Sequence, residues 1–213
     1  MPFYEDVEMM IQFESRARQR GYQAIAGVDE AGRGPLAGPV VAAAVILPPD
    51  YRHPEINDSK QLTPGKRERL YEVIKADAIA VGIGVIEASV IDRMNILRAT
   101  LMAMRDAVLD LSPPPDFVLV DGRNTIDVRT PQEAIIGGDG KSLSIAAASI
   151  IAKVSRDRIM EIYHRQFPQY NFLKNKGYGT GEHRDAILRC GPCKIHRLSF
   201  AVKSSVDRQP SLL

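Results

Sequence analysis

Apolar runs, separated by charged segments and by segments rich in glycine and proline, divide the chain into alternating strands and helices. Short runs rich in apolar and β-branched residues predict strands, and these runs lie at 24–29, 40–47, 78–86, 117–120 and 134–136. A loop from Ala31 to Pro39, broken by glycine and proline, joins the first two strands.

Apolar residues three and four positions apart predict the helices. A charged helix begins at Thr63–Pro64, and a long helix rich in alanine and serine runs from Ser144 to Tyr163. Two further helices, over the first 20 residues and over 182–189, are each followed by a glycine that favours a helix end. The clearest spacing predicts an amphipathic helix whose inward positions are Leu97, Leu101, Met104, Val108 and Leu111.

This order of elements predicts an α/β fold with a mixed central sheet flanked by helices. Early strands can pair as hairpins, whereas later strands are reached through helices and can lie parallel to their neighbours. The length of 213 residues suits one compact domain. Within it we distinguish an N-terminal helical extension (1–20), a core (21–164) and a basic, mainly helical C-terminal region (165–213) packed on the core.

Composition places the chain among ordinary soluble proteins. Hydrophobic residues make up 45% and charged residues 25% of the sequence, which excludes wholesale disorder. No uncharged apolar stretch of about 18 residues occurs, which excludes a transmembrane helix. The acidic N-terminus lacks the basic-then-apolar order of a secretion signal, and two cysteines are too few for a disulfide-built secreted scaffold. We therefore expect a cytoplasmic protein.

Charge is distributed unevenly along the chain. The segment from Arg165 to Leu213 contains nine basic and three acidic residues, whereas the preceding residues contain 19 basic and 23 acidic ones. A basic end on an acidic body favours contact with a polyanion. A solvated helical surface gives the same pattern, so charge alone leaves both interpretations open.

Four carboxylates lie where apolar strands stop: Asp29 and Glu30 end the first strand, Asp121 ends the fourth, and Asp139 follows the fifth. Ligands of α/β sheets gather at such strand ends. Four carboxylates in one place repel one another unless cations neutralise them, and Mg²⁺ and Mn²⁺ prefer oxygen ligands. Because neighbouring strand residues point to opposite faces, Asp29 and Glu30 share a site only if the chain bends at Glu30. Taken singly, each residue is equally typical of a turn or a helix cap.

Seven sequence blocks occur in an order and at spacings that resemble one known family. The first, at 27–40, reads GVDEAGRGPLAGPV. The others are DSKQL at 58–62, VDG at 120–122, GDGKS at 138–142, SIAAASIIAKVSRD at 144–157, KGYGT at 176–180 and HRLSF at 196–200. From Ile25 to Phe200 the chain therefore resembles the type 2 ribonucleases H, specifically the bacterial ribonuclease HII family.

The resemblance implies a ribonuclease H-like core with a helical C-terminal extension. It also implies a metal-dependent endoribonuclease that hydrolyses the RNA strand of RNA–DNA hybrids. Such an enzyme also cuts 5′ to single ribonucleotides in duplex DNA, leaving 3′-hydroxyl and 5′-phosphate ends. In that family Asp29, Glu30, Asp121 and Asp139 are the catalytic, metal-binding carboxylates. Two Mg²⁺ or Mn²⁺ ions would activate water and stabilise the leaving 3′-oxygen.

The same resemblance implies contacts with the substrate. The backbone of Gly32, Arg33 and Gly34 would reach the 2′-hydroxyl, because little side chain obstructs it, although this tripeptide alone is typical of a flexible turn. Lys60 would bind a backbone phosphate, and Tyr178 would stack on the deoxyribose that follows the ribonucleotide. The expected partners are RNA–DNA hybrid duplexes and ribonucleotide-containing DNA, bound by a monomer and away from membranes.

Two other classes of function compete with this interpretation. In a non-catalytic nucleic-acid binder the basic C-terminal region would bind and the carboxylates would be structural. In a dithiol oxidoreductase the motif Cys190-Gly191-Pro192-Cys193 would react. That chemistry needs the first cysteine at a helix N-terminus, where the helix dipole lowers the thiol pKa, whereas the predicted helix at 182–189 places Cys190 at a helix C-terminus.

The last five residues suggest one further partner. The segment Gln209–Leu213 reads QPSLL and resembles the clamp-binding peptides of bacterial replication proteins. Its glutamine, its small polar residue and its two terminal apolar residues suit a groove on a sliding clamp. A frayed chain end is the alternative.

Overall fold

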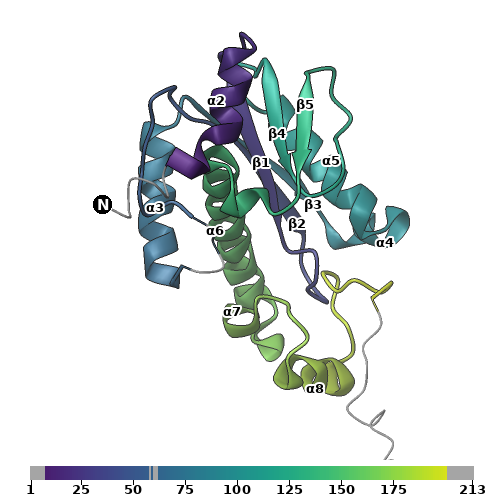
Figure 1. Cartoon of the computed structure of the whole chain (residues 1–213). Coiled ribbons are helices and arrows are strands. Elements are labelled where there is room, and N and C mark those ends of the chain that lie inside the picture. Colours follow the sequence, from purple (N-terminus) through teal and green to yellow (C-terminus); the bar gives the residue numbers. More distant parts are fainter. Residues whose placement is uncertain (1–7, 58, 60–61, 201–213) are drawn as a thin grey trace, which may run out of the picture.

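The computed structural model describes residues 8–57, 59 and 62–200, and over these residues the chain forms a five-stranded sheet flanked by helices (Figure 1). The strands are β1 (Ile25–Ala31), β2 (Val40–Ile46), β3 (Ala80–Ile86), β4 (Phe117–Asp121) and β5 (Gln132–Ile135). The helices are α2 (Gln12–Gln19), α3 (Pro64–Asp77), α4 (Ala88–Met94), α5 (Ile96–Leu109), α6 (Leu143–Gln166), α7 (Phe172–Asn175) and α8 (Gly181–Cys190). Short 3₁₀ turns form η2 (Gly138–Gly140) and η3 (Pro168–Tyr170).

The sheet is mixed, as the sequence predicts. Its order is β3-β2-β1-β4-β5. The first three strands pair as antiparallel neighbours, whereas β4 and β5 run parallel to β1 because helices precede β4 and a long loop precedes β5. In the pairing of β1 with β4, Ile25 lies opposite Phe117 and Val28 opposite Val120.

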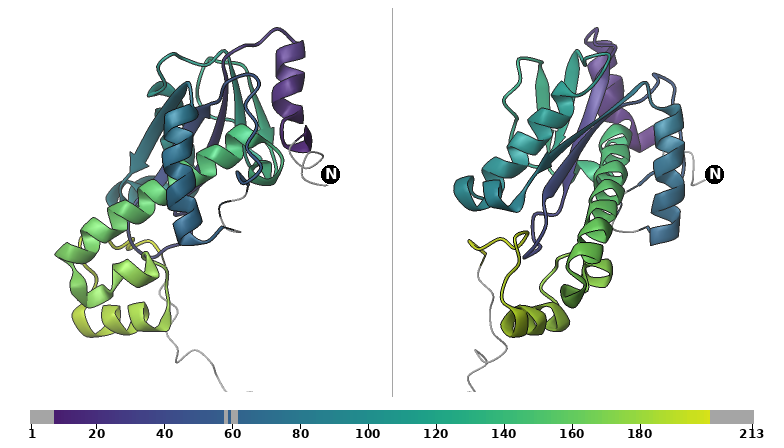
Figure 2. Two further views of the ribbon diagram at one scale, coloured as in Figure 1. Left: turned by 90° about the vertical axis from the view of Figure 1, so that its left-hand side faces the viewer. Right: turned by 180° about the vertical axis from the view of Figure 1, so that it is seen from behind.

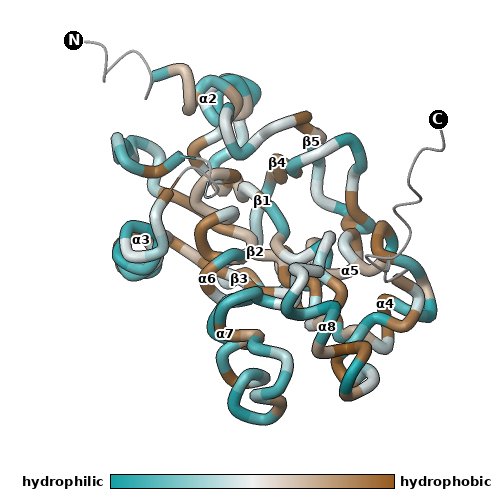
Figure 3. Tube along the Cα trace, turned by 90° about the horizontal axis from the view of Figure 1, so that it is seen from below, coloured by the Kyte–Doolittle hydropathy of each residue, from teal (hydrophilic) through white to brown (hydrophobic). Residues whose placement is uncertain are grey.

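Helices cover both faces of the sheet (Figure 2). Successive strand residues point to opposite sides, so Ala42, Ala44 and Ile46 of β2 pack in the cluster with α5, while Ala43 and Val45 pack in the cluster with α6. Outside α6 lies α3, whose solvent side is hydrophilic (Figure 3). None of the described helices is long and apolar enough to cross a membrane.

The buried face of α5 agrees with the predicted one except at its first position. Met104, Val108 and Leu111 are buried and Leu101 packs against the same cluster, but Leu97 is 42% exposed. Small residues also face the sheet, because the helix backbone lies directly against β3: a Cβ placed on Gly84 would lie 2.0 Å from the carbonyl oxygen of Ala103. Large side chains there would hold the helix away from the sheet, so the inward face includes alanines that the spacing of large apolar residues does not reveal.

At one end of the molecule, α6 extends past the sheet and carries the C-terminal region (Figure 2). There η3, α7, α8 and the segment after α8 pack around a separate apolar cluster that contains Met160, Tyr170, Phe172, Ala186 and Ile195. At the other end, the buried Glu14 of α2 accepts hydrogen bonds from the Ser142 hydroxyl at 2.7 Å and from the Ser144 amide at 3.0 Å. Both ends of the long helix are thus held by segments outside the sheet.

Candidate active site

Two aspartates lie side by side where β4 ends. Because β1 and β4 pair in register up to Val28 and Val120, the next residues of these strands, Asp29 and Asp121, are neighbours across a spacing of about 4.8 Å. Both strands alternate, so both carboxylates are on the α6 side of the sheet. Among the described strands, only β2 pairs with β1 beyond Asp121, so the other edge of β1 has no strand partner there and is called its open edge below.

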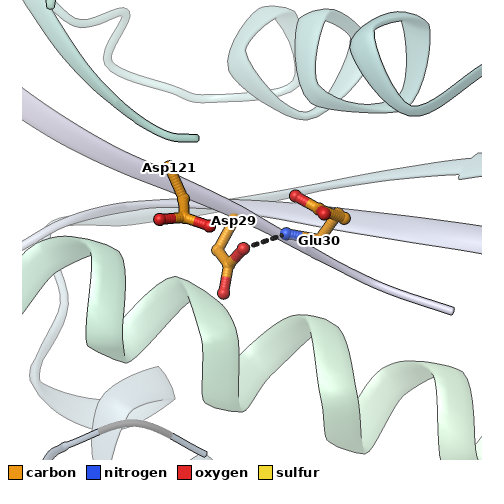
Figure 4. A group of neighbouring side chains, drawn as sticks. All are labelled: Asp29, Glu30 and Asp121. Atoms are coloured by element: carbon orange, nitrogen blue, oxygen red, sulfur yellow. Dashed lines mark hydrogen bonds between the residues drawn. The ribbon is translucent and has the colours of Figure 1, made fainter. Parts of the chain in front are cut away.

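The chain does not bend at Glu30, contrary to the sequence prediction. Strand β1 continues to Ala31, with Glu30 paired to Ala42. The amide of Glu30 instead donates to Asp29 Oδ1 at 2.7 Å along the open edge of β1 (Figure 4). Carboxylate oxygens of Asp29, Glu30 and Asp121 all lie within 4.8 Å of one another. The end of β4, rather than a bend in β1, therefore lets two consecutive residues share one site.

The cluster is electrostatically unfavourable without a cation. Burial raises the pKa of Asp29 well above its ordinary value, and the charges of Glu30 and Asp121 raise it further. Burial also raises the pKa of Glu30, against the opposing effect of Arg33, whose guanidinium lies 3.2 Å from Glu30 Oε1. Oxygen ligands whose ionised forms are disfavoured in this way fit a hard divalent cation.

The fourth predicted carboxylate, Asp139, is buried in η2. It is not part of the three-residue cluster, but its turn is attached to it, because the amide of Gly138 donates to Asp121 Oδ1 at 2.7 Å. The structure thus brings three of the predicted carboxylates together and ties the turn that holds the fourth to one of them.

Sequence reasoning missed a serine that contacts the cluster. Ser149 of α6 forms a side-chain hydrogen bond that opposes the rise in the pKa of Asp29, and its hydroxyl lies 2.7 Å from that of Ser59. A buried serine on the sheet-facing side of an alanine-rich helix needs a polar partner. This requirement could have identified Ser149 from the sequence as a residue close to polar groups of the sheet. Ser59 precedes Lys60, which lies outside the described residues, as do Gln209–Leu213.

The predicted substrate-binding loop lies against Tyr178. The atom nearest to a Cβ placed on Gly34 is Tyr178 Cε1, at 3.8 Å, and Tyr178 is 46% exposed. The carbonyl of Gly177 accepts from the amide of Leu36 at 2.8 Å, which joins the two segments. The structure therefore brings Gly32, Arg33, Gly34 and Tyr178 together, more than 140 residues apart in the chain.

Two buried arginines, also missed by sequence reasoning, bind carbonyl groups of the loop from Ala31 to Pro39. Arg156 donates to the carbonyls of Pro39 and Ala37 at 3.0 and 3.2 Å, and to that of Lys176, in the segment before Tyr178, at 3.0 Å. Arg197 donates to those of Gly38, Arg33 and Gly32 at 3.0, 2.9 and 2.6 Å. Burial lowers the pKa of Arg156 to about 10 and, together with the charge of Arg156, that of Arg197 to about 9. Their partners are backbone atoms, which leave no pattern in a sequence.

Two buried histidines, His183 and His196, form hydrogen bonds that determine which of their ring nitrogens carry a proton. The Tyr178 carbonyl can only accept, so His183 Nδ1 donates to it at 2.9 Å. The Cys193 amide donates to His196 Nδ1 at 2.9 Å, so the proton of His196 is on Nε2, which donates to His183 Nε2 at 3.1 Å. Both rings are therefore neutral, and an added proton on either one disrupts the arrangement.

The stability of the protein is expected to fall in acid because of His196. Burial and His183 lower its pKa from 6.5 to about 4. The unfolded chain then binds a proton that the folded chain does not, so stabilisation is complete above pH 6.5 and is lost as the pH falls towards 4. Urea unfolding at pH 7 and pH 4.5 should show a loss on the order of 2 kcal/mol greater in the wild type than in His196→Asn, which keeps an acceptor for the Cys193 amide. Equal losses of stability in the wild type and in His196→Asn would contradict the assignment of the acid sensitivity to His196.

The two cysteines lie as the sequence predicts. Cys190 is the last residue of α8, and both thiols are free. Burial raises the pKa of Cys193, whereas a reactive dithiol needs a lowered pKa. The geometry therefore disfavours the oxidoreductase interpretation.

Comparison with known proteins agrees with the sheet and its acidic site. The sequence model described as Ribonuclease HII matches residues 26–203. The ribonuclease HII of Syntrophus aciditrophicus (strain SB) is 70% identical over 196 residues, covering 92% of each chain. The crystal structure of ribonuclease H2 from Pyrococcus horikoshii OT3 has a TM-score of 0.69 and 26% identity, covering 84% of this chain and 95% of that one. The ribonuclease HII in a complex with PCNA from Archaeoglobus fulgidus has a TM-score of 0.69 and 26% identity, covering 85% and 96%.

A mixed sheet between helical layers, with carboxylates gathered where β1 passes the end of β4, defines an enzyme of the ribonuclease H class. Within that class, the chain belongs to the ribonuclease HII family. It is an endoribonuclease, a phosphodiester hydrolase that acts on the RNA strand of RNA–DNA hybrids.

Proposed function

We propose that this endoribonuclease also incises duplex DNA on the 5′ side of a single embedded ribonucleotide, leaving 3′-hydroxyl and 5′-phosphate ends. One observation carries the proposal: the acidic cluster, the Gly32–Gly34 loop and Tyr178 adjoin one another. Only Ala31 separates Glu30 from Gly32, so a phosphate at the cluster has its neighbouring sugar at the loop. We place this activity in the cytoplasm, in the removal of ribonucleotides from DNA.

Asp29, Glu30 and Asp121, with Asp139 from the adjacent turn, would hold two Mg²⁺ or Mn²⁺ ions. When bound, such ions supply Lewis acidity that activates water and stabilises the leaving 3′-oxygen. The residues themselves contribute fixed positions: register places Asp29 beside Asp121, Ser149 hydrogen-bonds Asp29, and the Gly138 amide orients Asp121. Arg33 holds Glu30 at the open edge of β1.

The remaining residues select and orient the substrate. Amides of the Gly32–Gly34 loop would bind the 2′-hydroxyl, which distinguishes RNA from DNA. Tyr178, half exposed beside Gly34, would stack on the following deoxyribose, and Lys60 would bind a backbone phosphate. The function thus divides between carboxylates that serve the chemistry and a loop with its tyrosine that recognises the sugar.

The test uses a DNA duplex that contains one ribonucleotide. A single nick 5′ to that ribonucleotide, present with Mg²⁺ or Mn²⁺ and absent with a chelator, is the expected result. Tyr178→Ala should reduce the cleavage rate of this duplex relative to a uniform RNA–DNA hybrid by about tenfold, whereas Tyr178→Phe, which keeps the ring, should not. Cleavage of the uniform hybrid alone would contradict the proposal.

The same protein preparations decide between the competing classes. A non-catalytic binder would bind the duplex without nicking it in either metal. A dithiol enzyme would keep its activity in a chelator and lose it on Cys190→Ser. The proposed nuclease is expected to nick the duplex with metal and to be unaffected by Cys190→Ser.

We also propose that Gln209–Leu213 binds a sliding clamp. The segment's glutamine and terminal leucines suit an apolar groove, and a relative of similar fold is described in a complex with PCNA. Deletion of these five residues should abolish binding to the clamp, measured by surface plasmon resonance, and leave the nicking of a short free duplex unchanged. Substituting Ser205, which precedes the segment, with alanine is the matched control and should keep binding; clamp binding that survives the deletion would end the proposal.

A further inference from the structure

The carbonyl oxygens of Gly32 and Arg33 both face the guanidinium of Arg197. Its Nη2 donates to the first at 2.6 Å and its Nη1 to the second at 2.9 Å. In a trans peptide the carbonyl of one residue and the amide of the next point in opposite directions. The amides of Arg33 and Gly34 therefore both point away from Arg197.

Two consecutive amides that point the same way form a concave donor pair, a backbone arrangement that binds anions and other acceptors. Within the described part of the chain, neither the Arg33 amide nor the Gly34 amide has a hydrogen-bond acceptor. Gly34 also lies beside the half-exposed ring of Tyr178. Arg197 thus leaves two donors available at the surface that recognises the sugar.

Backbone hydrogen bonds of Arg197 and of the two residues after it fix the position of Arg197. Its side chain is 2% exposed, and its amide donates to the Leu36 carbonyl at 2.8 Å. Asp92 of α4 accepts from the amides of Leu198 and Ser199, each at 2.9 Å. A buried guanidinium is costly to desolvate, and this one uses all three nitrogens on loop carbonyls.

From these contacts we infer that Arg197 is a positioning residue for recognition of the ribonucleotide. By holding the carbonyls of Gly32 and Arg33, it aims the Arg33 and Gly34 amides at the 2′-hydroxyl of the substrate. The inference rests on the proposed function of the Gly32–Gly34 loop and adds the residue that orients the amide donors of this loop.

Arg156 provides the matched comparison. It is equally buried and binds the same loop, but at Ala37 and Pro39 rather than at Gly32 and Arg33. Loss of either guanidinium should loosen the loop and lower the melting temperature. Only loss of Arg197 should release the two carbonyls whose peptide groups carry the donating amides.

The experiment measures binding without chemistry. Fluorescence anisotropy in a chelator gives the dissociation constants for a duplex with one ribonucleotide and for the same duplex with a deoxynucleotide at that position. The wild type should prefer the first duplex. Arg197→Lys, which keeps the charge but has a single donating nitrogen, should reduce that preference by about tenfold, while Arg156→Lys should keep it.

Each outcome has a distinct meaning. A folded Arg197→Lys protein that keeps the wild-type preference overturns the inference, and so does an equal loss in Arg156→Lys, which would indicate general loosening. If the wild type itself has no preference, the proposed role of the loop fails first. If Arg197→Lys does not fold, Asp92→Asn decides: it keeps Arg197 but weakens the support of Leu198 and Ser199, and an unchanged preference would overturn the inference.

Discussion

Replacing Asp29 with asparagine is expected to abolish cleavage while making the metal-free protein more stable. Burial and the charges of Glu30 and Asp121 raise the pKa of Asp29, so its ionised form destabilises the folded state at neutral pH. Asparagine keeps an acceptor for the Glu30 amide but removes the charge. We expect a loss of cleavage of at least about 100-fold and a melting temperature about 2–4 °C higher.

The sign of this stability change depends on pH. A raised carboxyl pKa means that the folded state binds more protons than the unfolded state above pH 3.8, so the destabilisation by Asp29 grows as the pH rises. The advantage of Asp29→Asn should therefore be present at pH 8 and vanish as the pH falls towards 3.8. Melting curves across that range, in a chelator, provide the measurement.

Asp116 gives a control of the same chemical type. It lies just before β4 and accepts from the amides of Gln23 and Ala24 at 2.8 and 3.0 Å, away from the acidic cluster. Asp116→Asn replaces an acceptor with a donor, so it should cost about 1 kcal/mol of stability and retain cleavage. A destabilised Asp29→Asn protein would indicate that the cluster is structural, as the non-catalytic interpretation requires.

Gly32→Ala is expected to be the most destabilising single-methyl substitution in the loop. Gly32 has a φ of +96°, which side chains rarely adopt, and a Cβ placed there would lie 2.0 Å from Arg156 Nε and 2.8 Å from the Pro39 carbonyl oxygen. Displacing Arg156 would leave three carbonyls without this donor, two of them in buried hydrogen bonds. We expect a loss of about 3–5 kcal/mol, or roughly 10 °C in the melting temperature.

Gly34→Ala is the matched substitution two residues away. A Cβ there meets only the Tyr178 ring, at an ordinary contact distance of 3.8 Å. Its melting temperature should therefore stay within about 2 °C of the wild type. Thermal melting of both variants followed by circular dichroism makes the comparison, and equal stability of the two would contradict the close approach of Arg156.

Most of the fold is predictable from the sequence because local patterns determine it. Strands β1 to β5 begin and end within about two residues of the predicted runs, since apolar β-branched residues favour extended structure wherever they are buried. The inward face of α5 was predictable except at Leu97, which fits the helical period but is exposed. The alanines that also face the sheet were not predicted, because their place depends on the glycines of β3 that let the helix backbone approach.

The carboxylates were predictable as residues and only partly as a site. Their places at strand ends follow from the sequence, and their proximity follows from the register of β1 with β4, which only tertiary pairing determines. The bend expected at Glu30 was wrong because the local rule of alternating faces ignores the end of a neighbouring strand. Arg156 and Arg197 lay within recognised blocks, yet their acceptors are carbonyl groups that any residue carries.

The contact between Glu14 and the start of α6 bears on where the chain can be shortened. Ser142 and Ser144 donate to this carboxylate, and a negative charge at that point also interacts favourably with the helix dipole. Two other residues of α6 contact the site: Ser149 forms a hydrogen bond with Asp29, and Arg156 donates to the Pro39 carbonyl of the loop. A protein that begins at residue 21 would lose this anchor of α6, so we expect α2 to contribute to the stability of both the acidic cluster and the loop.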